Sequence, residues 1–194
     1  MPNLIRRLPK AMLLALLLAL VVLPGARCSQ SSVEVAPTIG ASGPSSAITP
    51  VPGTGATWSN GSTPADASTG NLFNRVNSRR KSLGLTSLIW HDGLAAVSDK
   101  HSNDMLARSY FSLVTPEGVS IYQRLVSSSP RIDFANAYAF VTSSSGALAV
   151  FNALRATPAG LTAMDDPAMT HFGAGATSPG GAPATIIFGQ NVVP

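Results

Sequence analysis

Thirteen consecutive apolar residues, Ala11 to Leu23, follow a basic N-terminal segment and end at the helix-breaking pair Pro24 and Gly25. A helix that crosses a bilayer needs about 20 apolar residues, so this run is too short for a permanent membrane anchor. A basic start, a short apolar centre and small residues after it are typical of a signal peptide. We therefore predict that residues 1–28 direct export and take no part in the folded domain.

Cys28 is the only cysteine of the chain, and two interpretations of it remain open. Ala26 and Cys28 are small residues at the positions that signal peptidase reads, which predicts a mature chain that starts at Ser29. The alternative is lipidation of Cys28, as in a bacterial lipoprotein, which would anchor the chain to a membrane. The bulky Arg27 directly before the cysteine favours cleavage. A single cysteine also excludes a disulfide framework and a multi-cysteine zinc site.

Residues 29–70 are dominated by Ser, Thr, Gly, Ala and Pro, and five prolines interrupt the stretches that could become helical. Such a segment buries too little apolar surface to offset about 1–2 kcal/mol of backbone entropy per ordered residue. We predict a disordered, solvated linker that holds a domain away from the surface to which the chain is attached. This arrangement favours a protein retained at the cell envelope.

The formal net charge of +4 belongs to the predicted signal peptide. Four of the 13 Lys and Arg residues, and none of the 9 Asp and Glu residues, lie in residues 1–28. The rest of the chain is therefore formally neutral. Binding to nucleic acid depends on neutralising phosphates with an excess of basic residues, so we exclude a nucleic-acid partner.

Helical periodicity of apolar residues starts just after the linker and predicts one folded domain over residues 71–194. The first apolar stripe consists of Leu72, Phe73, Val76 and Leu83. Gly84 follows as a C-terminal stop, and we expect the basic run 79–81 to face solvent.

A second helix is predicted to start with Asp92 as its cap. Its apolar face carries residues at steps of three and four: Leu94, Val97, His101 and Met105. We therefore expect His101 to lie in the core. A hydrogen-bonded pair of His101 with Asp104, one turn later, is the alternative.

The remaining segments alternate between helical spacing of apolar residues and the short apolar runs that are typical of strands. Short helices are predicted over 119–126 and 147–154, and strands over 137–142, 172–176 and 184–188. A turn over 178–181 joins the last two strands as a hairpin. Helices interspersed with an antiparallel sheet indicate a compact α+β domain.

Short motifs of this domain resemble those of one family in their order and spacing. The clearest are His101-Ser102-Asn103-Asp104-Met105, Tyr110-Phe111-Ser112 and Pro116-Glu117-Gly118, followed by Asn136, Thr157-Pro158 and Gly173-Ala174-Gly175. Together they are similar to the bacterial, SCP-like extracellular branch of the CAP superfamily, which includes cysteine-rich secretory proteins, venom antigens and plant pathogenesis-related proteins. The resemblance implies a three-layer α-β-α sandwich around a central antiparallel sheet.

In many members of this family, two histidines and two acidic residues line a cleft that can bind a divalent metal ion. The matching positions of this chain are Leu113, Ala135, Thr157 and Gly160. A metal ion needs several converging lone-pair donors, which the side chains of Leu, Ala and Gly lack. Acid–base catalysis lacks a titratable group there for the same reason. The resemblance therefore implies a degenerate cleft without metal or cofactor, and the four positions remain a candidate ligand cleft.

The chain has three histidines, His91, His101 and His171. No two of them have the spacing that would place both imidazoles on one helix turn or one strand face as a pair of ligands. No nucleophile elbow or phosphate-binding glycine loop is present. We therefore predict an exported, non-catalytic CAP-like domain that acts at the bacterial cell envelope as a binding module for a protein, a glycan or a lipid. Contact with a membrane would be made only through a lipid on Cys28. The alternative is a hydrolase with a non-standard site that uses His171 or His101.

Overall fold

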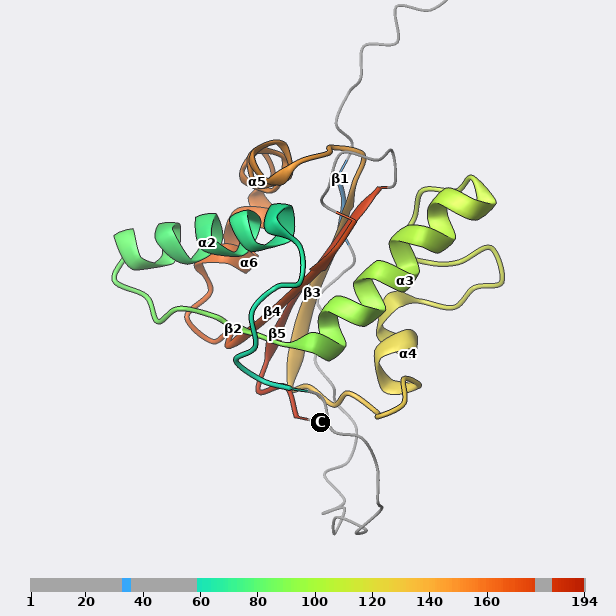
Figure 1. Ribbon diagram of the computed structural model, residues 1–194, viewed down its shortest axis with the longest axis horizontal. Helices are drawn as coiled ribbons and strands as arrows, with labels where there is room; N and C mark the ends of the chain where they lie inside the picture. Colours follow the sequence, from blue (N-terminus) through green and yellow to red (C-terminus); the bar gives the residue numbers. More distant parts are fainter. Residues whose placement is uncertain (1–32, 36–58, 177–182, 194) are drawn as a thin grey trace, which may run out of the picture. The chain divides into compact units, whose positions relative to one another are not determined.

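The computed structural model describes residues 33–35, 59–176 and 183–193, in which a five-stranded sheet has helices on both faces (Figure 1). The elements in chain order are β1 Val33–Val35, α2 Ala67–Ser82, β2 Ile89–Trp90, α3 Asp92–Arg108, α4 Ile121–Val126, β3 Asn136–Thr142, α5 Ala147–Arg155, α6 Pro158–Asp165, β4 His171–Gly175 and β5 Ala184–Gln190. The strands lie in the order β1-β3-β5-β4-β2.

The predicted α+β sandwich is confirmed, with one correction to the sheet. The pairs β1–β3, β3–β5 and β5–β4 are antiparallel. β2 instead runs parallel to β4, with Ile89 opposite His171 and Trp90 opposite Phe172. The predicted antiparallel sheet is present in β3, β5 and β4, whereas the parallel edge strand β2 was not predicted, because a strand of two residues has no readable alternation.

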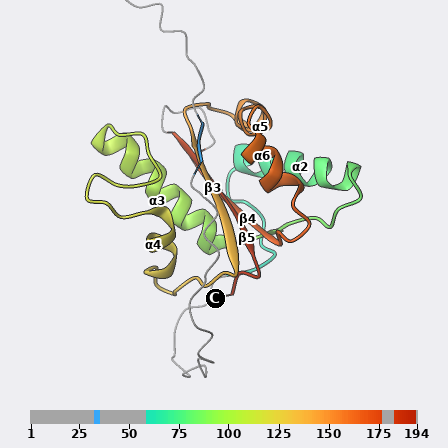
Figure 2. The same ribbon diagram turned by 180° about the vertical axis from the view of Figure 1, so that it is seen from behind.

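Alternate residues of the central strands belong to two separate cores. One helical layer covers each face of the sheet (Figure 2). On β3, Phe140 belongs to the core under α2, α5 and α6, whereas Ala139 and Val141 belong to the core under α3 and α4. The helices supply Leu72, Val76, Val150, Leu154, Ala163 and Met164 to the first core, and Leu94, Val97, Met105, Ile121, Tyr122 and Leu125 to the second. The sheet therefore separates the two helical layers.

Two glycines of β4 allow the backbone of α3 to lie directly against the strand. A Cβ atom at Gly173 would lie 2.5 Å from the backbone nitrogen of Ala95, and one at Gly175 would lie 2.6 Å from the Cα of Asp99. Real Cβ atoms do not approach so closely. The Gly-x-Gly motif is thus explained by close helix–strand packing.

The buried face of α2 differs from the predicted one. Leu72 and Val76 are buried as expected, but the next residue on that face is Arg80, which has no exposed surface. Its guanidinium donates to four backbone carbonyls at 2.8–3.1 Å: those of Thr86, Met164, Asp166 and Met169. Leu83 follows the last helical residue and is 51% exposed. Placing Arg80 in solvent and Leu83 in the core was wrong, because this set of carbonyl acceptors offsets the burial of the charge.

The cap of α3 is also different from the predicted one. His91 is the N-cap, and its Nδ1 accepts a hydrogen bond from the backbone N–H of Leu94 at 3.2 Å. Asp92 lies in the first turn, where its carboxylate accepts from the Trp90 indole at 2.9 Å and from the Ser62 hydroxyl at 2.5 Å. The prediction assigned the cap one residue too late.

The structured part of the chain starts before the predicted boundary at residue 71. α2 begins at Ala67, and the Asp66 carboxylate caps it. The backbone N–H of Gly61 donates to the Trp90 carbonyl at 2.9 Å, so hydrogen bonds tie the end of the predicted linker to β2. β1 also lies within the predicted linker.

The other predicted helices and strands match α4, α5, β3, β4 and β5 to within a few residues at their ends, whereas α6 was not predicted. The predicted signal peptide with Cys28, most of the linker and the whole turn over 178–181 lie outside the described residues. In the part of the chain that is described, no helix combines the length and apolar character needed to span a bilayer.

Candidate functional site

Leu113, the first of the four family positions, is part of the core. Its side chain is 1% exposed and packs in the cluster that includes Met105, Ile121 and Leu125. Its carbonyl accepts the backbone N–H of Ile121 at 2.9 Å, which ties the loop after α3 to the start of α4. Leu113 is therefore a packed core residue.

Ala135 is the last residue of the loop that leads from α4 to β3. It is exposed, directly before β3, and its backbone N–H donates to the Gln190 carbonyl at 2.9 Å. Its methyl group offers neither a metal ligand nor a proton donor. Its backbone hydrogen bond extends the pairing of β3 with β5 by one residue.

Thr157 and Gly160 form the start of α6, on the other side of the sheet from Leu113. Thr157 is the N-cap, and its hydroxyl accepts the backbone N–H of Gly160 at 3.0 Å. Gly160 is buried so tightly that a Cβ atom there would overlap the Leu154 carbonyl oxygen and lie 2.8 Å from Thr157 Oγ1. The backbone therefore excludes any side chain at position 160, a histidine included.

Two of the four candidate residues belong to opposite helical layers. Leu113 belongs to the core under α3 and α4, whereas Gly160 lies in α6, which covers the core on the opposite face. Within residues 59–176 and 183–193, no three His, Cys, Asp or Glu side chains are grouped so that they could hold a metal ion. The residues present do not fit the metal site of the family.

His91 and His171 lie together although their sequence spacing indicated no pair. β2 and β4 run side by side, and the two imidazole rings meet edge to face with 5.8 Å between their centroids. Both side chains are buried, and burial, followed by the neighbouring His171, lowers the pKa of His91 to about 4. Nε2 of His91 has no hydrogen-bond partner among the described residues. The register of a two-residue strand creates this pair, so the sequence carried no signal for it.

His101 is buried, as predicted from its place on the apolar face of α3. Its Nε2 lies 2.9 Å from the Ser112 carbonyl, and burial lowers its pKa. The alternative pairing with Asp104 is absent from the described contacts, because that carboxylate bonds Arg108, Arg124 and Tyr110 instead. His101 holds the loop after α3 and is shielded from solvent.

His171 contacts a hydroxyl, but the hydroxyl is already engaged. Its Nδ1 lies 2.8 Å from Oγ1 of Thr170. That oxygen also accepts the backbone N–H of Asn191 at 2.9 Å and lies 3.3 Å from the Gly189 carbonyl. Burial lowers the pKa of His171. His171 and Thr170 thus stabilise the start of β4, and the threonine hydroxyl is not free to act as a nucleophile.

A model of the cysteine-rich secretory protein family, CAP, matches residues 73–191. The chain belongs to the CAP family. Among solved structures, this CAP chain resembles an extracellular protein containing an SCP domain from Bacillus anthracis, with 21% identity and a TM-score of 0.56. That match covers 67% of this chain and 45% of the Bacillus chain, so the chain spans less than half of that protein.

An outer surface protein from Borrelia burgdorferi is similar as well, with 16% identity and a TM-score of 0.57 over 70% of this chain and 98% of the Borrelia chain. No curated protein matches the sequence of the chain significantly. At these identities the two structures support the CAP fold alone.

Proposed function

We propose that this CAP chain is exported and acts at the bacterial cell envelope as a non-catalytic binding module. Its ligand is a protein, a glycan or a lipid of that envelope. The proposal rests on Gly160: at the position where the family places a metal-binding histidine, the Leu154 carbonyl leaves no room for a Cβ atom.

The other family positions support the same proposal. Leu113 is buried among apolar side chains, and Ala135 has no donor. With no group that titrates near neutral pH at these positions, they provide neither a general base nor a metal-activated water.

The histidines support it too. The lowered pKa values of His91, His101 and His171 follow from burial, so all three are neutral at physiological pH. His91 caps α3, His101 contacts a backbone carbonyl, and His171 contacts a threonine that is already engaged. The hydrolase alternative therefore lacks an exposed base beside a free hydroxyl.

Export is supported by the predicted signal peptide over residues 1–28 and by the predicted linker, and the two similar structures come from an extracellular and an outer surface protein. A chain of this kind would meet envelope polymers or surface proteins first. A solvated linker would allow the domain to bind its ligand at a distance from the surface to which the chain is attached.

The test is sedimentation of the full chain with envelope fragments from its own host, with and without a chelator. We expect the chain to sediment with the fragments, equally with chelator present. The His171→Asn variant serves as the matched control and should sediment to the same extent. Failure to sediment, or release by the chelator, would show that the proposal is wrong.

A further inference from the structure

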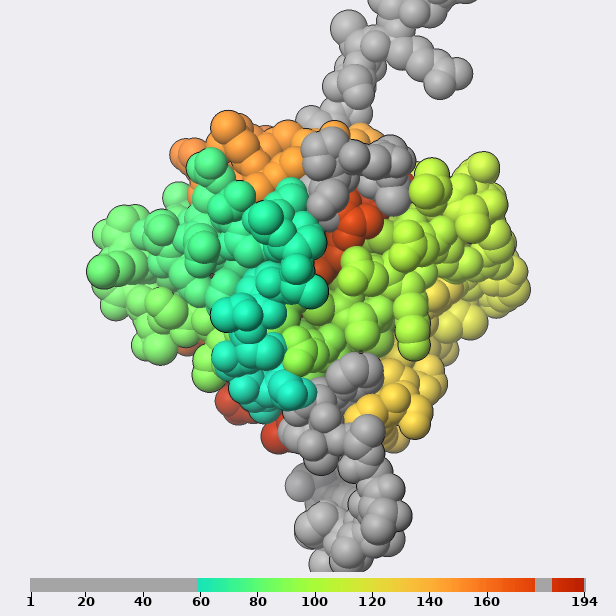
Figure 3. Space-filling view, in the orientation of Figure 1, coloured from blue at the N-terminus to red at the C-terminus, as the bar shows by residue number. Residues whose placement is uncertain are grey.

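A polar groove with a volume of about 530 Å³ runs along the outer side of α2 where this helix packs beside α5. Three arginines line it: Arg75 and Arg79 from α2, and Arg155 from α5. Figure 3 shows the two helices meeting on the surface, α2 in green and α5 in orange. The volume lies within the range of roughly 300–1,000 Å³ that is usual for sites of small ligands.

The charged residues that line the groove are all basic. α2 contributes Arg75 and Arg79 and α5 contributes Arg155, whereas Arg80 of α2 is buried. Asp165 pairs with Arg79 but is not itself among the lining residues. A concave surface of one sign attracts ligands of the opposite charge.

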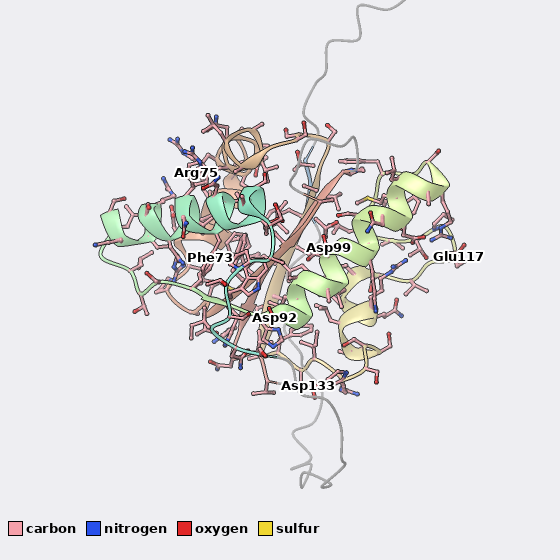
Figure 4. The ribbon with its side chains drawn as sticks, in the orientation of Figure 1. Phe73, Arg75, Asp92, Asp99, Glu117 and Asp133 are labelled. Carbon is pink, nitrogen blue, oxygen red and sulfur yellow. The ribbon has the colours of Figure 1, made fainter. Side chains whose placement is uncertain are left out.

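Two of the three arginines are free to bind an anion. Arg79 is already engaged by Asp165, with Nε and Nη2 at 2.7 and 2.5 Å from its carboxylate oxygens. Arg75 and Arg155 have no carboxylate partner within residues 59–176 and 183–193. Figure 4 labels Arg75 on α2, on the side toward α5. The guanidinium of Arg155 lies over the ring of Phe151, 5.6 Å from its centroid, which orients it beside the groove.

The rest of the lining is suited to hydroxyl groups. Asn71, Asn74 and Ser78 lie along the same side of α2 at helical spacing and are exposed. Amide and hydroxyl side chains both donate and accept hydrogen bonds, as sugar hydroxyls require, whereas guanidinium forks match phosphate oxygens. No acidic side chain lines the groove to repel an anion.

We infer that this groove binds a glycan that carries phosphate groups, with Arg75 and Arg155 on the phosphates and the α2 amides and hydroxyls on the sugars. The inference rests on the proposed binding function and names its ligand class. Apart from Phe151, every side chain that lines the groove is polar or charged, which suits the hydroxyl groups of a sugar chain better than the acyl chains of a bilayer.

The test measures binding of the full chain to dextran phosphate at low salt, with unmodified dextran, inorganic phosphate and phosphatidylglycerol vesicles as comparison probes. We expect the chain to bind dextran phosphate more tightly than any of the other three. Arg75→Gln and Arg155→Gln should each weaken binding about tenfold, because each removes a charge-assisted contact. Lys81→Gln removes a charge from the same helix outside the groove, and its effect should stay below about twofold.

Equal loss in the Lys81→Gln variant would show attraction to net charge only and would overturn the inference. Tighter binding to vesicles would overturn it in favour of a lipid, and equally tight binding to inorganic phosphate would overturn the role of the sugar. If the Arg75→Gln and Arg155→Gln variants still sediment with host envelope fragments as the unaltered chain does, the assignment of the binding site to this groove is wrong. The proposed function would then still stand.

Discussion

Nη1 of Arg80 donates to the carbonyl oxygen of Met164 at 2.8 Å, so a guanidinium from α2 closes the last turn of α6. Its other hydrogen bonds reach the segments before β2 and β4. A buried arginine thus joins three segments through their backbones. Each unpaired carbonyl would carry a desolvation penalty if this group were removed.

We predict that Arg80→Lys lowers the free energy of unfolding by about 2–4 kcal/mol, because one ammonium cannot reach acceptors that a planar guanidinium spans. Urea denaturation followed by circular dichroism measures the change. Arg75→Lys, an exposed change in the same helix, should shift it by less than about 0.5 kcal/mol. Equal stability of the two variants would show that the carbonyls around Arg80 are satisfied in another way.

Two glycine substitutions should have opposite effects. Gly160→Ala forces a methyl group against the Leu154 carbonyl and should lower the free energy of unfolding by about 1–3 kcal/mol. Gly70→Ala lies within α2, where the new Cβ would meet only Pro64 Cβ at 3.9 Å, and should raise it by about 0.5–1 kcal/mol. Thermal unfolding of both variants tests this, and a Gly160→Ala protein as stable as the unaltered chain would contradict the packing at position 160.

His91 should make the fold sensitive to acid. Burial lowers its pKa to about 4, from about 6.5 in the unfolded chain, so the folded state binds fewer protons between these values. Stability is therefore complete above about pH 6.5 and falls as the pH drops toward about 4, by on the order of 2–3 kcal/mol from this group.

His91→Asn keeps a capping acceptor for α3 and removes the titration. The loss of stability between about pH 7 and about pH 4.5, measured by urea unfolding, should be smaller in this variant than in the unaltered chain. His101 and His171 remain and titrate in the same direction. An identical loss in both proteins would rule out His91 as a source of the acid sensitivity.

Restoring one histidine should not restore a metal site. Leu113→His places an imidazole in an apolar core and should lower the free energy of unfolding by about 2–4 kcal/mol. Zinc should produce no recovery of the melting temperature, because Ala135 and Gly160 supply no further ligands. Leu113→Met, which nearly conserves volume, should cost less than about 1.5 kcal/mol. Zinc-dependent stabilisation of Leu113→His would show that donors converge at this position.

Apolar periodicity predicted the buried face of α3, including His101, and the burial of Leu72 and Val76 on α2. The same reasoning was wrong for Arg80, which lies one helical turn after Val76. Its charge predicted exposure to solvent, but its guanidinium donates to backbone carbonyls of segments that are distant in the sequence. The family motifs identified Gly160 as a histidine position, but only the backbone shows that no side chain fits there.

The meeting of His91 with His171 and the groove beside α5 depend on how distant segments are placed, which spacing along the chain does not encode. Asp92 was predicted as a cap because its type is typical of caps, yet the imidazole one residue earlier accepts the hydrogen bond. Local patterns therefore predicted elements and faces, and missed contacts made through tertiary structure.

Native mass spectrometry of the full chain, extracted from the envelope of its own host, tests the binding proposal most directly. We predict a chain whose mass starts at Ser29, which carries no metal ion and retains envelope glycan that leaves on collisional activation. A chain that retains a divalent metal ion in a one-to-one ratio and carries no envelope component would contradict it.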